Sequence, residues 1–131
     1  MSPYVVAGRA GANAALRVAL LAADRALIAQ RVGSALDTLA LADVYDVRTG
    51  LREDGYHPAF IGGIVPTNVT DQAAQRHGLA DLRTEFPGLV TAPIPHSPYV
   101  ERAANRGMPV TLAYPDTPAA RAYTALAHQL L

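Results

Sequence analysis

Phe60-Ile61-Gly62-Gly63-Ile64-Val65 is the stretch of sequence that decides the fold. Its residues are apolar or glycine throughout, without the alternation of apolar and polar residues that a half-exposed strand shows. Such an unbroken run is typical of a parallel strand that is covered on both faces. We therefore expect a strand of a parallel sheet here, and we expect Pro66, which follows directly, to end it.

Further strands and helices alternate on both sides of this run. Three more short apolar runs are expected to be strands: 4–7, 26–29 and 89–92. Helical spacing of apolar residues, or a Ser/Thr-Pro start, marks the stretches between and after them: 14–21, 34–50, 71–86 and segments beginning at Ser97-Pro98 and Thr117-Pro118. This alternation predicts an α/β fold with a parallel sheet of four to five strands flanked by helices.

Composition limits both the number of domains and the kinds of partner. At 131 residues, half of them hydrophobic, the chain is expected to form a single domain over residues 1–131. Its formal net charge is zero, so no overall field attracts it to nucleic acid or to a membrane. The Ala-rich run from Ala10 to Ala23 contains Arg17 and is too short to span a bilayer. With no cysteine to form disulfides, a cytoplasmic location is expected.

Three motifs in the last third of the chain resemble those of a known family. They are Ile94-Pro95-His96-Ser97, Gly107-Met108-Pro109-Val110 and Pro115-Asp116-Thr117-Pro118-Ala119-Ala120-Arg121-Ala122-Tyr123. In this order and spacing they resemble the C-terminal end of ParA/MinD-type deviant Walker (SIMIBI) ATPases, which segregate plasmids and place other cargo. A looser similarity includes Ala22-Ala23-Asp24 and the segment from Gly63 to Asn68. The resemblance implies that nearly the whole chain corresponds to the C-terminal half of this P-loop NTPase-like fold.

The sequence departs from the family at the residues that carry its chemistry. Family members bind phosphate with P-loop lysines, whereas all eleven basic residues here are arginine. The glycine-containing turn from Gly8 to Asn13 lacks the spacing of a P-loop. The strand that resembles the family's Walker B-like strand ends at Ala7, where a carboxylate normally acts on Mg²⁺. We therefore expect no ATPase activity and no cofactor for the isolated chain; ATP and Mg²⁺ are expected only if a P-loop half is supplied.

The resemblance also implies where a nucleotide and DNA would lie. The base of a nucleotide would lie near Thr67-Asn68 and Pro95-His96. Without a phosphate cradle, these polar groups are expected to cap strands and helices instead. Arg102 and Arg106 lie near the region where partition ATPases can carry DNA-contacting residues. Two such residues on a chain without net charge predict weak, non-specific DNA contact at most, because affinity requires several phosphate contacts.

Other catalytic and metal sites are not indicated by the sequence. The four histidines lack the spacing of metal ligands: His57, His77, His96 and His128. No serine lies in a Gly-x-Ser-x-Gly elbow, so a hydrolase triad is not indicated. We therefore expect no metal site and no catalytic residue in the chain itself.

These observations together favour a truncated or degenerate ParA-like partition protein that lacks ATPase activity of its own and acts through self-association or partner binding. In the family, the P-loop strand lies between the counterparts of strands 4–7 and 26–29. If these two strands close up, the first becomes an unpaired edge; if they do not, another chain completes the sheet. Both outcomes favour a homo-oligomer or a protein partner.

Two alternatives remain open at this point. The chain could be the C-terminal half of a split or truncated ParA-type ATPase in DNA segregation, with its P-loop half on another polypeptide. It could also be a small-ligand-binding α/β domain that uses the carboxyl ends of its strands, where ligands of such sheets bind.

Overall fold

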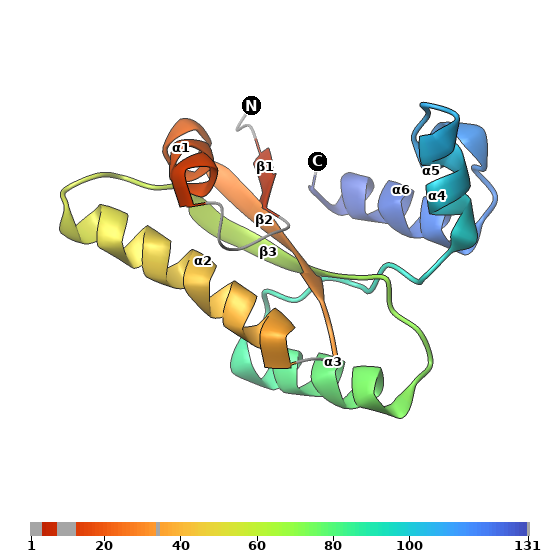
Figure 1. Cartoon of the computed structure of the whole chain (residues 1–131), viewed down its shortest axis with the longest axis horizontal. Helices are drawn as coiled ribbons and strands as arrows, with labels where there is room; N and C mark the ends of the chain where they lie inside the picture. Colours follow the sequence, from red (N-terminus) through yellow and green to blue (C-terminus); the bar gives the residue numbers. More distant parts are fainter. Residues whose placement is uncertain (1–3, 8–12, 34, 131) are drawn as a thin grey trace.

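A computed structural model of the chain describes residues 4–7, 13–33 and 35–130. Strands and helices alternate through most of the chain, which confirms the predicted α/β fold (Figure 1). In chain order the elements are β1 (Tyr4–Ala7), α1 (Asn13–Ala22), β2 (Arg25–Arg31), α2 (Ala35–Glu53), β3 (Phe60–Thr67), α3 (Ala73–Glu85), α4 (Pro98–Asn105), α5 (Val110–Ala113) and α6 (Pro118–Leu130).

The sheet formed by the described residues has three parallel strands in the order β1-β2-β3, fewer than the four or five that we expected. β1 pairs directly with β2, from Tyr4 opposite Arg25 to Ala7 opposite Ile28. β3 pairs with the other side of β2, ending with Arg31 opposite Thr67. The first two strands have therefore closed up, and β1 lies at the edge of this sheet.

The segment at 89–92, expected to be a strand, runs beside β3 without forming a continuous ladder. It makes an isolated parallel bridge between Ile64 and Val90, and a second bridge follows further on. Pro93 and Pro95 follow this segment directly, between the two bridges and at the second one, and have no N–H to donate to a regular ladder. The segment therefore follows β3 only at separate points.

Pro66 does not end β3, contrary to our expectation. The strand continues to Thr67, with Pro66 opposite Gln30 of β2. Proline lacks the donor of a strand residue but keeps the acceptor, and the Pro66 carbonyl accepts a hydrogen bond from the Ile94 N–H at 2.8 Å. The proline is therefore compatible with an internal strand position because its carbonyl still pairs.

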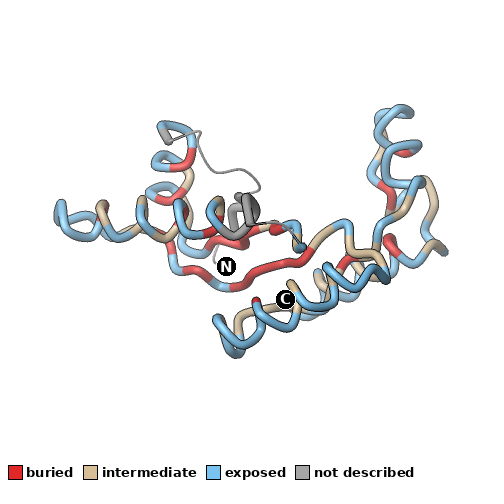
Figure 2. Tube along the Cα trace, turned by 60° about the horizontal axis from the view of Figure 1, so that its bottom comes forward, coloured by how far each residue is buried: buried red, intermediate tan, exposed pale blue. Residues whose placement is uncertain are grey.

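Apolar side chains form separate clusters on the two faces of the sheet. The buried residues lie largely along the strands, whereas much of each helix is exposed (Figure 2). On one face, buried residues of α1, α2 and α3 pack against Ala26, Ile28, Ile61 and Ile64. On the other face, α6 packs partly buried side chains against Leu27, Val65 and Ile94. A third small cluster, Ala103, Val110 and Ala120, joins α4, α5 and α6 to one another. The sheet thus has three helices on one face and α6 on the other.

Helix ends agree only in part with the sequence-based expectation. Ser97 caps α4 as expected, with its hydroxyl accepting from the Tyr99 N–H at 3.2 Å. α3 begins after Gln72 without a side-chain cap, although Thr70 and Asp71 precede it and are residue types that commonly cap helices. The Thr70 hydroxyl instead donates to the Gln75 side chain at 3.0 Å. The expected cap at Ser34 lies outside the described residues.

Within the described part of the chain, no helix combines the length and the apolar character needed to cross a bilayer.

Candidate functional site at the strand ends

The residues that the resemblance places near a nucleotide base lie together at the carboxyl end of β3. Thr67 is the last residue of β3, and Asn68 follows it in the left-handed region, with φ +57°. The Asn68 side-chain oxygen and His96 Nδ1 are 2.6 Å apart, in a hydrogen bond that the ring N–H donates. The two residues are separated by 28 positions in the sequence, so this contact joins distant segments of the chain.

Backbone hydrogen bonds hold this contact in place. The Val69 N–H donates to the Ile94 carbonyl at 3.0 Å, and the His96 N–H donates to the Val69 carbonyl at 2.9 Å. Pro95 lies between the two bonded residues and forms the second isolated bridge with Val69. Asn68 is one of the few residue types that tolerate a positive φ, so it suits this turn. The side chains of Asn68 and His96 are exposed, in a pair that fixes the two segments relative to each other.

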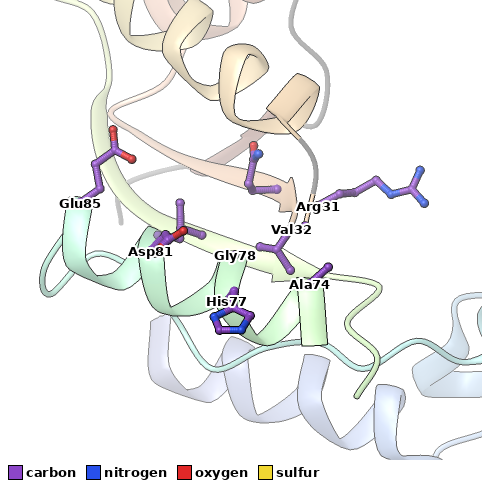
Figure 3. Close-up of a pocket in the computed structure, with 10 residues that line it drawn as sticks. Arg31, Val32, Ala74, His77, Gly78, Asp81 and Glu85 are labelled. Carbon is purple, nitrogen blue, oxygen red and sulfur yellow. The ribbon is translucent and has the colours of Figure 1, made fainter. Parts of the chain in front are cut away.

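A cleft of about 260 Å³ lies at the same end of the sheet, between the end of β2 and α3 (Figure 3). Gln30 is the buried polar residue of this wall, with 6% of its surface exposed. The Arg31 side chain extends away from the α3 residues (Figure 3). The lining residues are Gln30, Arg31, Val32, Gly33, Ala74, His77, Gly78, Asp81, Leu82 and Glu85.

The sequence indicated the β2 side of this cleft but not its α3 side. Gln30 to Gly33 directly follow the strand expected at 26–29, and ligands of parallel sheets bind at such carboxyl ends. His77, Asp81 and Glu85 were not recognised, although their spacing of four residues places them along one side of a helix. That spacing is the signal that could have identified them. Since a solvated helix face has the same pattern, it does not by itself indicate a ligand.

α3 approaches the end of β2 very closely at two glycines. A Cβ added to Gly78 would lie 2.8 Å from the backbone nitrogen of Gly33, a distance that real Cβ atoms do not show. Gly33 itself has φ +104°, which also favours glycine. Glycine is unfavourable within a helix, yet α3 runs through Gly78 without interruption. The glycine pair sets the width of the cleft at this point.

Arg102 lies on α4 and Arg106 is the C-terminal cap of that helix. The Arg102 guanidinium lies over the Tyr99 ring, 5.2 Å from its centroid, and the Arg106 guanidinium lies 5.7 Å from the centroid of Tyr114. The two tyrosine rings are themselves in contact, with centroids 4.9 Å apart. The predicted arginine pair is thus part of a row of four planar groups in contact, in which the two tyrosine rings are tilted by 54°; we call it the Arg-Tyr row. Neither tyrosine was recognised as a contact of these arginines from the sequence.

The described residues contain no group of three or more histidines, cysteines and carboxylates close enough to hold a metal ion. The geometry also does not fit the phosphates and Mg²⁺ that the family binds. Direct pairing of β1 with β2 occupies the place that the resemblance assigns to the P-loop strand. Lysine is absent from the sequence, and Ala7 ends β1 where a carboxylate would be needed.

Comparison with known proteins supports the fold. No protein-family model matches the chain, and no curated protein matches it significantly. Among solved structures, the chain is similar to the cell division ATPase MinD of Pyrococcus furiosus, with 23% identity over 86% of this chain and 44% of that one, and a TM-score of 0.63. It is also similar to MinD of Pyrococcus horikoshii OT3 in complex with Mg-ADP, with 18% identity, a TM-score of 0.64, and coverage of 86% and 43%.

A third similar structure is an ATP complex of an McdA variant from Cyanothece, with 23% identity and a TM-score of 0.65, covering 83% of this chain and 45% of that chain. The chain thus spans less than half the length of each of these structures. At this level of identity the comparison concerns the fold. The chain has the fold of part of a MinD- or McdA-type ATPase, as the resemblance of its sequence to the ParA/MinD group predicted.

Proposed function

We propose that this chain is a degenerate partition-type protein without ATPase activity of its own, which acts through self-association or by binding a protein partner in the cytoplasm. The observation that carries the proposal is the direct pairing of β1 with β2. A P-loop strand supplied by another polypeptide would have to break this pairing to reach its family position. Even then, Ala7 offers no carboxylate for Mg²⁺.

The remaining rim groups would give a nucleotide little to bind. The Asn68 side-chain oxygen and His96 Nδ1 already bond to each other, so a base would have to compete with this contact to use these two atoms. The sequence contains no lysine, so this rim offers no lysine ammonium group to a phosphate. Our proposal is that the pair joins β3 to the following segment and does not act as a base-binding site.

Calorimetry with MgATP and a phosphate-release assay test the proposal. We expect no heat of binding at micromolar protein and no phosphate release above buffer. A matched variant, Asn68→Ala with His96→Ala, should give the same result. A micromolar dissociation constant for MgATP, equivalent to about −8 kcal/mol, would overturn the proposal.

The split-enzyme alternative predicts a different outcome. If this chain is half of a ParA-type ATPase, adding a polypeptide with a lysine-bearing P-loop should produce hydrolysis that depends on both components. We expect the mixture to hydrolyse no more ATP than the P-loop polypeptide alone, because the β1–β2 pairing occupies the insertion point. Hydrolysis that rises in proportion to added chain would favour the alternative.

A second candidate function is weak DNA contact through the Arg-Tyr row. The observation that favours it is that Arg102 and Arg106 are exposed while their planar groups stack on Tyr99 and Tyr114. Stacking restrains the guanidinium groups, which lowers the entropy that they lose on contact with phosphate. With only two cations, the contact would be weak and independent of sequence.

A further inference from the structure

One large apolar side chain in the sheet is left uncovered. Phe60 begins β3, and 67% of its surface is exposed. Its neighbour Ile61 is 9% exposed and belongs to the cluster under α1, α2 and α3. An isolated exposed apolar residue is ordinary in proteins. Phe60 differs because it stands at the side of a hollow of about 430 Å³.

The hollow exists because of a bulge in β3. Ala26 is opposite Ile61, and the next residue Leu27 is opposite Gly63, so Gly62 is an extra residue without a partner on β2. Gly62 is exposed and has no side chain to fill the space beside Phe60. The same surface therefore carries a protruding aromatic ring and a cavity. We call it the Phe60 patch; its lining residues are Asp24, Arg25, Phe60, Ile61, Gly62 and Leu89.

The helix on the other face of the sheet does not extend over this patch. α6 packs on Leu27, Val65 and Ile94, whereas Phe60 lies at the amino end of β3. In a parallel sheet both faces are normally covered. The amino end of β3 thus retains an apolar surface that a further layer can bury.

The charges around the patch indicate which kind of partner can cover it. Asp24 and Arg25 are adjacent, exposed and of opposite sign. A uniformly acidic or basic partner would be attracted by one of them and repelled by the other. A second copy related by a two-fold axis can place its arginine against Asp24 and its aspartate against Arg25, because an isologous interface repeats each contact twice.

We propose that the Phe60 patch is the surface through which two copies of this chain associate, with Phe60 of each copy inserted into the hollow of the other. This inference rests on the self-association in the proposed function and names its surface. The patch lies at the amino ends of the strands, away from the rim where a nucleotide would bind. A buried aromatic ring removes about 150–250 Å² from water, as expected of the central contact of a small interface.

Sedimentation of a Phe60→Glu variant over a range of micromolar concentrations tests the proposal. We expect the dimer dissociation constant to increase about 30-fold or more, since a charge replaces the central apolar contact. Leu112→Glu is the matched control: Leu112 is 69% exposed on α5, and its replacement should leave association unchanged. Circular dichroism and thermal unfolding should show both variants folded.

A mixing experiment tests the charge pairing with the fold unchanged. Asp24→Arg and Arg25→Asp should each weaken self-association, since two-fold pairing then places like charges together. An equimolar mixture of the two variants should associate again, because every contact pairs opposite charges. If the mixture fails to associate although wild type does, two-fold pairing of these residues is wrong.

A variant at the sheet edge separates this proposal from the broader one. Val6→Pro removes a backbone donor from β1 and should leave the dimer intact. If Val6→Pro abolishes the dimer and Phe60→Glu does not, association occurs at the edge; the Phe60 patch is then wrong while self-association stands. If wild type is monomeric throughout, self-association is wrong as well, whereas the absence of ATPase activity is tested independently by calorimetry.

Discussion

Gly78 shows how a single residue can have a tertiary role that its local sequence does not indicate. Within a helix, glycine is normally unfavourable because it retains the most freedom in the unfolded chain. Here the absence of a Cβ allows α3 to meet the backbone of Gly33. The lower helix propensity of glycine at this position is tolerated because the close approach joins α3 to the end of β2.

Replacing Gly78 by Ala should therefore destabilise the protein, although alanine is the better helix former. We expect a loss of about 1–3 kcal/mol, because the new methyl group forces helix and backbone apart. Gly50 provides the control: it lies in α2 and a Cβ there would meet nothing within 4 Å. Gly50→Ala should raise stability by about 0.5–1 kcal/mol. Urea unfolding of the two variants should show opposite signs; equal signs would mean that the Gly33–Gly78 approach carries no energy.

Tyr45 carries a hydroxyl that its surroundings do not satisfy. Its ring stacks on Phe86 with centroids 5.4 Å apart, and its buried oxygen has no hydrogen-bond partner among the described residues. Burial raises the pKa of Tyr45 above its ordinary value of 10.0, an effect that the nearby Arg48 charge partly offsets. The folded state therefore favours the neutral phenol.

Tyr45→Phe should increase stability by about 1 kcal/mol, because it removes an unpaired buried hydroxyl and keeps the stacked ring. It should also change the alkaline behaviour. Above pH 10.0 the unfolded Tyr45 ionises while the folded one stays protonated, so its contribution to stability is present below pH 10.0 and falls as pH rises towards the raised pKa. Urea midpoints of wild type and variant should therefore diverge further above pH 10.0. A constant difference would argue against burial of the hydroxyl.

At the scale of single elements, α4 depends on the Arg-Tyr row as well as on its N-terminal cap. Cation–π contacts at exposed sites contribute about 0.5–1 kcal/mol each. Arg102 and Arg106 thus have a structural role apart from any contact with DNA. A loss of DNA binding on Arg→Ala replacement needs to be separated from a loss of packing against Tyr99 and Tyr114.

We expect duplex DNA to bind with a dissociation constant no tighter than about 1 µM and a logarithmic salt dependence of about −2, as two phosphate contacts give. Replacing Arg102 and Arg106 with Ala should abolish this binding, and replacing both with Lys should retain it, since the charge is kept. Arg76→Ala with Arg83→Ala removes the same charge from α3 and serves as the control. Binding that survives the first pair of changes would place the DNA surface elsewhere.

Local patterns predicted the elements themselves well. The apolar runs that became β2 and β3 were identifiable because their signal lies within consecutive residues. The roles of Pro66 and Gly62 were not identifiable, because each depends on a neighbouring segment. The Pro66 carbonyl accepts from the Ile94 N–H, and Gly62 is the extra residue where the register of β3 shifts against β2. The interrupted segment after Gly88 was overestimated as a strand for the same reason.

The candidate site divides in the same way. The family resemblance assigned two separate segments, at Asn68 and at His96, to one rim, and the side chains of these two residues are in contact. Their proximity to a nucleotide base stays a prediction. The α3 side of the cleft, at His77 and Asp81, was not, because four-residue spacing is also that of a solvated helix. Some tertiary contacts are encoded neither in a local pattern nor in the family resemblance. These contacts could not be predicted from the sequence.

At the scale of the whole molecule, the three apolar clusters are unequal. The largest lies between the sheet and α1, α2 and α3, whereas α4 and α5 are held through a small cluster with α6. α6 in turn joins the sheet through Leu27, Val65 and Ile94. The three C-terminal helices lie together at one end of the molecule (Figure 1). A unit attached through one small cluster should open at lower free energy than the main core.

Hydrogen exchange followed by mass spectrometry should therefore show faster exchange in α4, α5 and α6 than in β2 and β3. Leu126→Ala should enlarge this difference, because Leu126 is one of the α6 side chains packed on the sheet cluster. A loss of about 1.4 kcal/mol there corresponds to about tenfold faster exchange, confined to the C-terminal helices. Leu112→Ala, at a side chain 69% exposed on α5, should leave exchange unchanged. If Leu126→Ala accelerated exchange equally in β2 and β3, the clusters would open as one unit, and the C-terminal helices would be part of the main core.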